Sequence, residues 1–184
     1  MRLISKQEIN HYRRNIHEIL NIERDMRLTE KFMIEFGDEL NWKKISKYQI
    51  LSEQFIVANI HRVDWAEICV HQVLSEAFIT KYQMSVNWDQ ISAFQELSEK
   101  FIKDNEFNLD MFQIFRWQEL SEEFLREFEF NYGWTNVFQY QKLSESFIRE
   151  YKNSADWRHV CNYQTLSLNF IEELECYIYQ SKEI

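Results

Sequence analysis

One six-residue segment recurs along this chain at a constant interval of 23 residues. It begins with Leu, continues with Ser or Thr, and carries large apolar residues four and five positions after the Leu. The seven copies are LTEKFM at 28, LSEQFI at 51, LSEAFI at 74, LSEKFI at 97, LSEEFL at 120, LSESFI at 143 and LSLNFI at 166. Seven copies without insertion or deletion indicate a repeat architecture in which each copy is one structural unit.

Further columns of similar residues precede each Leu, and they are numbered here from that Leu (L). Large apolar residues occupy L−9 and L−6, an aromatic residue or His occupies L−3, and Gln occupies L−2. The members are Trp42, Trp65, Trp88, Met111, Trp134 and Trp157 at L−9; Ile22, Ile45, Ile68, Ile91, Ile114, Val137 and Val160 at L−6; Tyr48, His71, Phe94, Trp117, Tyr140 and Tyr163 at L−3; and Gln49, Gln72, Gln95, Gln118, Gln141 and Gln164 at L−2.

Capping residues divide each unit into two helices. The Ser or Thr after each Leu is a preferred N-cap, and the Leu before it can pack on the Ile four residues into the helix, as Leu51 can on Ile56. A second row of N-caps lies ten residues before each Leu, at Asn41, Asp64, Asn87, Asp110, Gly133 and Asp156. Each unit should therefore hold one helix of about nine residues and a second of about eight to ten.

Other architectures conflict with this spacing. In a single long helix, 23 residues would rotate the apolar stripe by about 140° per copy, so no face could stay buried. Heptads are not sustained, and the strand pattern of leucine-rich repeats is missing. Pro is absent and Gly occurs only twice, which favours helices joined by tight capped turns.

We therefore predict an all-α solenoid of seven 23-residue helix-turn-helix repeats, with a short N-terminal capping helix. The repeats occupy residues 18–178 as one domain, residues 1–17 form the capping helix, and residues 179–184 form a C-terminal tail. Short helices are unstable alone, so stacking of neighbouring units must supply the stability. The repeats are centred on Leu28, Leu51, Leu74, Leu97, Leu120, Leu143 and Leu166.

The net charge of −9 argues against electrostatic attachment to nucleic acid or to an anionic membrane. No apolar run reaches the roughly 18–20 residues that span a bilayer, and the N-terminus lacks the apolar core of a signal peptide. We expect a cytoplasmic protein, in the host cytoplasm if the source is viral, that binds neither membrane nor nucleic acid directly. The oligomeric state stays open.

Motifs for catalysis, metals and cofactors are missing from the sequence. It contains no Gly-rich phosphate loop, no nucleophile elbow and no clustered His, Cys and carboxylate set. The three cysteines, Cys69, Cys161 and Cys176, form no Cys-x-x-Cys pair, and we expect them to serve as small packing residues. We therefore expect a protein that is not an enzyme and has no catalytic residue, cofactor or metal site.

A Glu follows the capping residue in six copies, at Glu30, Glu53, Glu76, Glu99, Glu122 and Glu145. Each Glu falls in the first turn of its helix, where a negative charge suits the helix dipole. The same row could also form a contact line for a basic partner, or a crude copy of a phosphate backbone. We favour the dipole interpretation, because local capping alone accounts for the repetition.

The Gln and aromatic columns are interpreted as parts of the core. A Gln among apolar neighbours can bond to the loop or helix end of the adjacent unit and so satisfy buried polar groups. The Trp and Tyr columns could form a stacking platform for single-stranded nucleic acid, but that also requires a basic groove. Core packing at helical spacing is the interpretation we favour.

Positions where one unit departs from its siblings are the best candidates for partner binding, because core requirements are shared by all copies. Small residues at L−5 give way to Phe115 and Phe138 in adjacent units, and Phe112 lies nearby in sequence. Residues 98–130 carry nine acidic and four basic residues, a net charge of −5. This combination suits a hot spot for a protein with a basic surface. The candidate contact residues are Phe112, Phe115, Phe138, Glu99, Glu122, Glu123 and Glu145. The alternative, which we favour, is that the two Phe rings merely repack around Met111, where most other copies have Trp.

The pattern W-x-x-I-x-x-Y-Q-x-L-S-E-x-F-I resembles tandem repeats in hypothetical proteins encoded by bacteriophages, giant viruses and bacterial mobile elements. It is carried by residues such as Trp88, Ile91, Gln95, Leu97, Ser98, Glu99, Phe101 and Ile102, and it covers about residues 18–178. The resemblance transfers no activity to particular residues. It implies a virus or mobile element as the source, and such genomes often encode non-enzymatic inhibitors of host proteins.

Two functions are therefore expected from the sequence. The first is a non-catalytic protein-binding scaffold, in its narrower form a phage or mobile-element inhibitor of a host defence protein. The alternative is an acidic nucleic-acid mimic that blocks a nucleic-acid-binding protein. Mimicry predicts an affinity that falls steeply with salt, whereas an aromatic hot spot predicts weak salt dependence.

Overall fold

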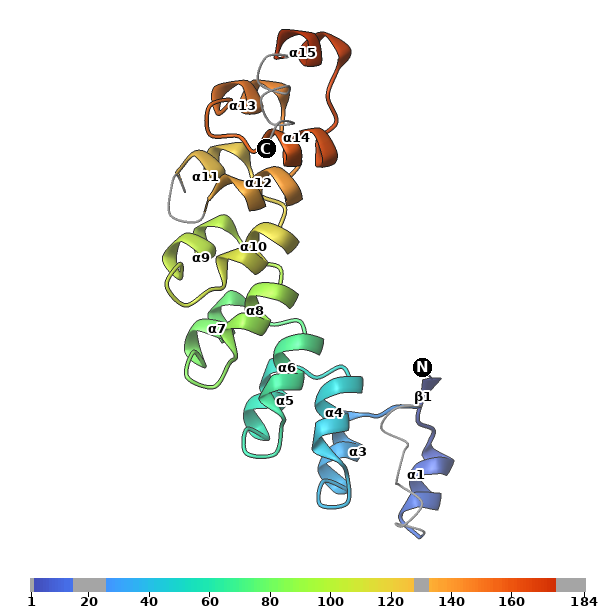
Figure 1. The fold of residues 1–184 in the computed structure, drawn as a ribbon. Helices are drawn as coiled ribbons and strands as arrows, with labels where there is room; N and C mark the ends of the chain where they lie inside the picture. Colours follow the sequence, from blue (N-terminus) through green and yellow to red (C-terminus); the bar gives the residue numbers. More distant parts are fainter. Residues whose placement is uncertain (1, 15–25, 128–132, 175–184) are drawn as a thin grey trace. The chain divides into compact units, whose positions relative to one another are not determined.

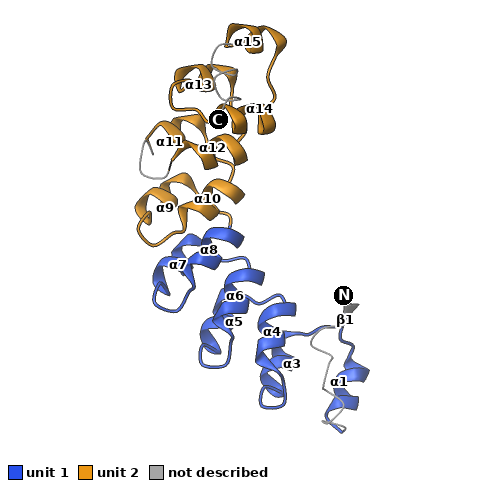
Figure 2. Ribbon diagram, in the orientation of Figure 1, with its two compact units in different colours: residues 1–95 blue, residues 96–184 orange. Residues whose placement is uncertain are grey.

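The computed structural model describes residues 2–14, 26–127 and 133–174, and regular structure in these residues is helical apart from one pair of two-residue strands (Figure 1). The chain divides into two compact units, residues 1–95 (unit 1) and 96–184 (unit 2) (Figure 2). The predicted all-α helical-repeat solenoid is confirmed. The repeat pattern in the sequence continues without a break through Gln95 and Glu96, where the units divide.

Unit 1 begins with the strands and the N-terminal helix and continues with regularly spaced short helices. Its elements are β1 (Arg2–Leu3), α1 (Lys6–Tyr12), β2 (Met26–Arg27), α3 (Glu30–Glu35), α4 (Trp42–Tyr48), α5 (Glu53–Ala58), α6 (Trp65–His71), α7 (Glu76–Lys81) and α8 (Trp88–Phe94). Unit 2 contains α9 (Glu99–Asp104), α10 (Met111–Trp117), α11 (Glu122–Glu127), α12 (Trp134–Tyr140), α13 (Glu145–Glu150), α14 (Trp157–Tyr163) and α15 (Leu168–Glu173).

Two helix types alternate in both units. Helices A have seven residues and precede each Leu; they are α4, α6, α8, α10, α12 and α14. Helices B have six residues and follow the capping Ser or Thr; they are α3, α5, α7, α9, α11, α13 and α15. In unit 1, α4 contacts α6 and α6 contacts α8; in unit 2, α10 contacts α12 and α12 contacts α14.

The predicted N-caps are confirmed in both rows. The Ser52 hydroxyl accepts a hydrogen bond from the Phe55 N–H at 3.1 Å, and the Asn41 side chain accepts one from the Lys44 N–H, also at 3.1 Å. Gly133 begins α12 without a side-chain cap and at a φ of 75°, a conformation that favours glycine. The Ile at the fourth helical position, such as Ile56 or Ile102, is fully buried.

Both helix types are shorter than the sequence analysis predicted. Helix A ends where the Gln at L−2 leaves helical geometry; Gln49, for example, has φ −92° and ψ 152°. Helix B ends directly before a turn that is closed by backbone hydrogen bonds; after α5, for example, the Arg62 N–H donates to the Asn59 carbonyl at 2.8 Å. Hydrophobic periodicity alone could not locate these ends, because apolar residues continue beyond them.

The buried Gln column links each repeat to the preceding one. Gln72 Oε1 accepts from the Leu51 N–H at 2.9 Å, and its Nε2 donates to the carbonyls of Ser46 and Gln49 at 2.8 and 2.7 Å. Gln141 repeats the arrangement in unit 2 with the Leu120 N–H and the carbonyls of Phe115 and Gln118. The predicted structural role of the Gln column is confirmed, and the series of bonds is called the glutamine ladder below.

The N-terminal segment departs from pure helix. β1 pairs in parallel with β2, and the Ile4 N–H extends the pairing to the Arg27 carbonyl at 3.0 Å. Helix α1 begins at the N-cap Ser5 with a reciprocal bond to Glu8. It approaches α3 through Tyr12, whose ring lies 6.2 Å from that of Phe32, and through Arg13, which binds Glu35. The predicted capping helix thus corresponds to α1 in its described part; residues 15–17, the start of the first repeat at 18–25 and the tail at 179–184 lie outside the described residues.

The cysteines differ from one another in burial. Cys69 is buried at L−5, as predicted, and burial raises the pKa of its thiol. Cys161 occupies the same position in the last repeat but is exposed, so its predicted packing role is wrong. Within residues 133–174, no later repeat follows that could cover this position. Cys176 lies outside the described residues.

Candidate functional site

The Glu row is built into the stacking of the repeats. In unit 2, Glu99, Glu122 and Glu145 each use Oε1 to accept the backbone N–H of the capping Ser of the next repeat; the distances to Ser121, Ser144 and Ser167 are 2.5, 2.6 and 2.6 Å. In unit 1, Glu53 accepts from the Ser75 N–H at 2.7 Å in the same way. Each of these carboxylates thus stabilises the start of the next helix B, which the dipole interpretation alone does not describe.

Glu123 is different from its neighbour. It follows Glu122 on α11, is exposed, and has no partner among the described residues. Of the four predicted acidic contact residues, only Glu123 is therefore fully available to a partner, whereas Glu99, Glu122 and Glu145 are half-buried and engaged by Ser amides.

The prediction for Phe115 and Phe138 requires correction. Their side chains are 2% and 0% exposed, so they form part of the core and we remove them from the candidate surface. Phe138 packs in a cluster with Ile148, Trp157 and Phe170. The alternative interpretation, that the two rings repack the interior, agrees with this burial.

Position L−5 holds small residues in unit 1, and two of them accept hydrogen bonds from the backbone. Ser46 and Cys69 are buried, and each accepts the backbone N–H of the next helix A N-cap, Asp64 at 2.9 Å and Asn87 at 3.5 Å. Phenylalanine offers no such acceptor. Helices α10 and α12 of unit 2 therefore have apolar volume at L−5 in place of a polar contact, whereas α14 has Cys161 there.

Phe112 lies on the surface, at 41% exposed, and it belongs to a larger aromatic group. Its ring centroid lies 6.1 Å from that of Tyr140 on the next helix A. The Arg116 guanidinium lies 4.9 Å from the Trp117 ring and 5.7 Å from the Tyr140 ring. Trp117 and Tyr163 are 58% and 54% exposed.

The L−3 column is therefore a surface column, and the prediction that it belongs to the core is wrong. The burial pattern of helix A gives the reason: in α12, Val137 and Phe138 are buried at L−6 and L−5, and Gln141 follows at L−2. Burial at these positions leaves L−8, L−7, L−4 and L−3 facing outward. The helical spacing of L−3 relative to the apolar residues at L−6 and L−5 already predicts an outward position. The prediction of a core position followed instead from the aromatic character of the column.

We call the outward residues of α10, α12 and α14 the helix-A face of unit 2. Besides the rings, it carries three side-chain amides without a partner among the described residues: Asn136, Gln139 and Asn162. Gln113 accepts a hydrogen bond from the Trp117 indole at 3.0 Å. No sequence motif joins these three amides, so they could not be predicted as a group.

Charge is divided between the two helix types of unit 2. Helices α10, α12 and α14 contain two basic residues, Arg116 and Arg158, and no carboxylate. Helices α9, α11, α13 and α15 contain four basic and nine acidic residues, a net charge of −5. The acidity of unit 2 thus lies mainly outside the helix-A face.

The acidic helices of unit 2 pair across repeats. We call residues L+6 and L+7 of helices B the helix-B ridge. Lys103 contacts Glu127 at 2.5 Å, Arg126 contacts Glu150 at 3.0 Å, and Arg149 contacts Glu173 at 2.7 Å, each pair joining successive repeats. The hydrogen bond from Arg149 holds the pKa of Glu173 below its ordinary value.

The helix-B ridge of unit 1 is less charged. It exposes Ile34 and Val57 at L+6, and Thr80 stands at the same position in the next repeat. A cavity of about 420 Å³ opens beside it between α5 and α7, lined by residues that include Val57, Phe78, Lys81 and Tyr82.

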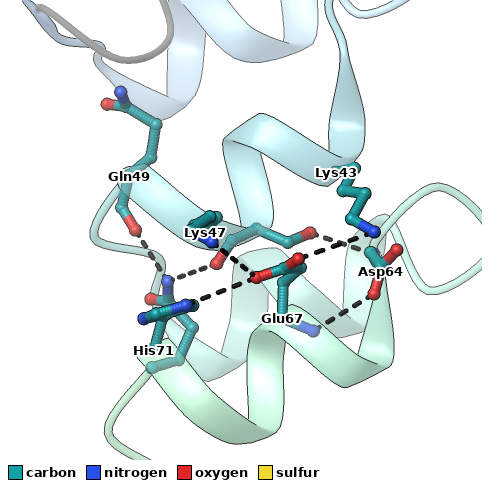
Figure 3. A network of polar contacts seen from close by, with 8 residues as sticks. Lys43, Lys47, Gln49, Asp64, Glu67 and His71 are labelled. Carbon is teal, nitrogen blue, oxygen red and sulfur yellow. Dashed lines mark hydrogen bonds and ion pairs between the residues drawn. The ribbon is translucent and has the colours of Figure 1, made fainter.

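The outward side of α4 and α6 in unit 1 carries a polar network centred on one carboxylate (Figure 3). Glu67 is largely buried and lies 3.7 Å from Lys43, 3.7 Å from Lys47 and 3.3 Å from His71. Two lysines and a histidine therefore surround a single carboxylate here. The network joins the neighbouring helices α4 and α6.

No group of three His, Cys, Asp or Glu residues with metal-binding geometry occurs in the part of the chain that the structure describes. None of the described helices has the length and apolar character needed to cross a bilayer. Comparison with known proteins identifies no relative: no family model, no curated protein and no solved structure matches the chain.

Proposed function

We propose that this chain is a non-catalytic protein-binding scaffold, and that the helix-A face of unit 2 is a contact surface for its partner. One observation carries the proposal: three successive helices A end in an aromatic ring at L−3, although the core and the glutamine ladder do not require these rings. Tyr140, the middle ring, is half-buried. Trp117 and Tyr163 are more than half exposed.

The composition of this face suits protein recognition. Trp, Tyr and Arg are the residues most enriched at binding hot spots, and grouped exposed apolar side chains mark interaction sites. Arg116 stacks on two of the rings, and so holds them in a defined arrangement before a partner arrives. The absence of carboxylates from α10, α12 and α14 favours a neutral contact over the basic partner surface expected from the net charge.

The alternative, an acidic nucleic-acid mimic, has weaker support. A mimic needs carboxylates that are free to meet a basic protein. Glu99, Glu122 and Glu145 instead accept backbone N–H groups, and Glu127, Glu150 and Glu173 pair with Lys or Arg. The narrower role of a phage or mobile-element inhibitor of a host protein rests on the resemblance of the repeat pattern alone.

The proposal is tested by affinity capture followed by direct binding to the purified partner. We expect the double variant Trp117→Ser/Tyr163→Ser to lose a partner that the native chain retains. Phe107→Ser is the matched control, because Phe107 is equally aromatic and fully exposed but lies in the loop between α9 and α10. Capture that survives the double variant, or that falls steeply with salt and requires Glu123, would contradict the proposal.

A further inference from the structure

The spacing of the rings limits which ligands the helix-A face of unit 2 can fit. Helices α10, α12 and α14 pack in succession, and each ends in one ring, Trp117, Tyr140 and Tyr163. Packed helices lie about 8–10 Å apart, so the rings recur at about that interval. A ligand that used all three rings would need the same period along its length.

A polyproline II segment has this period. It contains three residues per turn and rises about 3.1 Å per residue, which gives a repeat of about 9 Å. In a β-strand, side chains on one face recur about every 6.7 Å, which fits the ring spacing less well. Proline-rich segments are also the ligands that aromatic-lined grooves recognise, because their conformation is already ordered.

The polar groups of the face suit the backbone of such a segment. A polyproline II backbone has no internal hydrogen bonds, and proline itself can only accept them. The face supplies donors: Asn136, Gln139 and Asn162 have side-chain amides without partners among the described residues, and no carboxylate on α10, α12 or α14 competes as an acceptor. These amides stand beside the rings, within one helical turn of L−3.

Charge distinguishes this ligand from a single-stranded nucleic acid, which would also stack on rings. Unit 2 contains nine basic and seventeen acidic residues, a net charge of −8, and its helices A contribute only Arg116 and Arg158 as cations. Binding to nucleic acid requires several phosphate contacts in a positively charged groove. A neutral chain meets no comparable repulsion.

We infer that the helix-A face of unit 2 binds a proline-rich segment in the polyproline II conformation, with its prolines against Trp117, Tyr140 and Tyr163 and its carbonyl groups facing the amides of Asn136, Gln139 and Asn162. This inference rests on the proposed function and adds the class of partner.

The test uses the full chain and two peptide display libraries of equal length. One library fixes proline at every third position, and the other excludes proline. We expect enrichment from the first library only. The selected peptides should bind at least tenfold more weakly to Trp117→Ser and to Asn136→Leu/Asn162→Leu, and as before to Phe107→Ser. Circular dichroism and the melting temperature verify that each variant is folded.

Three results would overturn the inference: no enrichment from the proline library, equal enrichment from both libraries, or tighter binding of a random 20-nucleotide RNA or DNA than of any peptide. The proposed function has a separate outcome. If affinity capture depends on Trp117 and Tyr163 while no proline-rich peptide binds, the scaffold function stands and only the partner class is wrong. If capture is also unaffected by the double variant, both fail.

Discussion

Units 1 and 2 each have an interior of similar composition, but their surfaces differ. Both contain the glutamine ladder, buried Ile or Val at L−6 and a Ser or Thr cap before each helix B. Unit 1 contains twelve basic and thirteen acidic residues, a net charge of −1, whereas unit 2 has a net charge of −8. The ridge is joined by ion pairs in unit 2 and exposes apolar residues in unit 1.

This difference distinguishes the residues that stacking requires from the surface residues that can vary between repeats. Residues present in every repeat make the bonds between repeats, so they describe the fold and not a partner. Ridge and face residues change from one unit to the other without altering the ladder. Functional residues are therefore to be sought among the positions that vary, but only where helical phase exposes them, which is why Phe112 remains a candidate and Phe138 does not.

The largest expected effect comes from giving unit 2 a small residue at L−5, as in unit 1. Phe138→Ala removes a fully buried ring from the cluster that includes Ile148 and Trp157. We expect a loss of about 3–5 kcal/mol in the free energy of unfolding, measured by chemical denaturation. Phe112→Ala, at the surface, should change it by no more than about 0.5 kcal/mol. If Phe138→Ala lost no more stability than about 0.5 kcal/mol, Phe138 would not be a core residue.

The second effect tests whether the glutamine ladder is equivalent in the two units. Gln72→Ala in unit 1 and Gln141→Ala in unit 2 each leave one N–H and two carbonyl groups without their partner. Both variants should lose about 2–3 kcal/mol of stability in denaturant melts. A loss of stability in only one of the two variants would mean that the Gln side chain does not stabilise the two units equally.

A smaller effect concerns the Glu row and has a control in the adjacent residue. Glu122→Ala removes the acceptor for the Ser144 N–H, whereas Glu123→Ala removes a carboxylate without a partner among the described residues. Both substitutions alter the first turn of α11 alike. Glu122→Ala also removes a surface ion pair with Arg126 at 3.7 Å, which contributes little, so the difference in stability mainly reports the bond between repeats. We expect Glu122→Ala to be the less stable variant by about 1 kcal/mol in the same melts.

The smallest effect distinguishes the charged ridge of unit 2 from the apolar ridge of unit 1. Because the pKa of Glu173 is lowered in the folded chain, its pairing with Arg149 stabilises the fold at neutral pH and is lost as the carboxylate is protonated. Stability should therefore decrease between about pH 5 and pH 3. In Arg149→Gln that decrease should be smaller, and high salt should reduce the difference from the native chain. An unchanged acid response would exclude this pair as a contributor.

The fold could be predicted from the sequence because its determinants are local and repeated. Leu51, Ser52 and Ile56 identify the start of one helix, and Asn41 identifies the other. The sequence predicts that Gln72 bonds to buried polar groups, but it does not say which ones. The structure shows that these groups belong to the preceding repeat.

The candidate site was less accessible to prediction. Trp117 was assigned to the core because large rings are usually buried, although the phase of Ile114 and Phe115 on the same helix places it outward. Glu122 was read within its own helix, and the Ser144 N–H that it accepts lies 22 residues away. Contacts between repeats become predictable only once the direction of stacking is known.

The glutamine ladder also determines how such a chain can change in length. The side chains of Gln72 and Gln141 bond to groups about one repeat earlier, so the removal of 23 residues from within a unit rejoins such a Gln side chain to an equivalent set of groups. Duplication of 23 residues has the same property. Unequal recombination within the gene can thus shorten or lengthen the protein by whole repeats. A duplicated repeat contains the buried residues needed to pack against its neighbours.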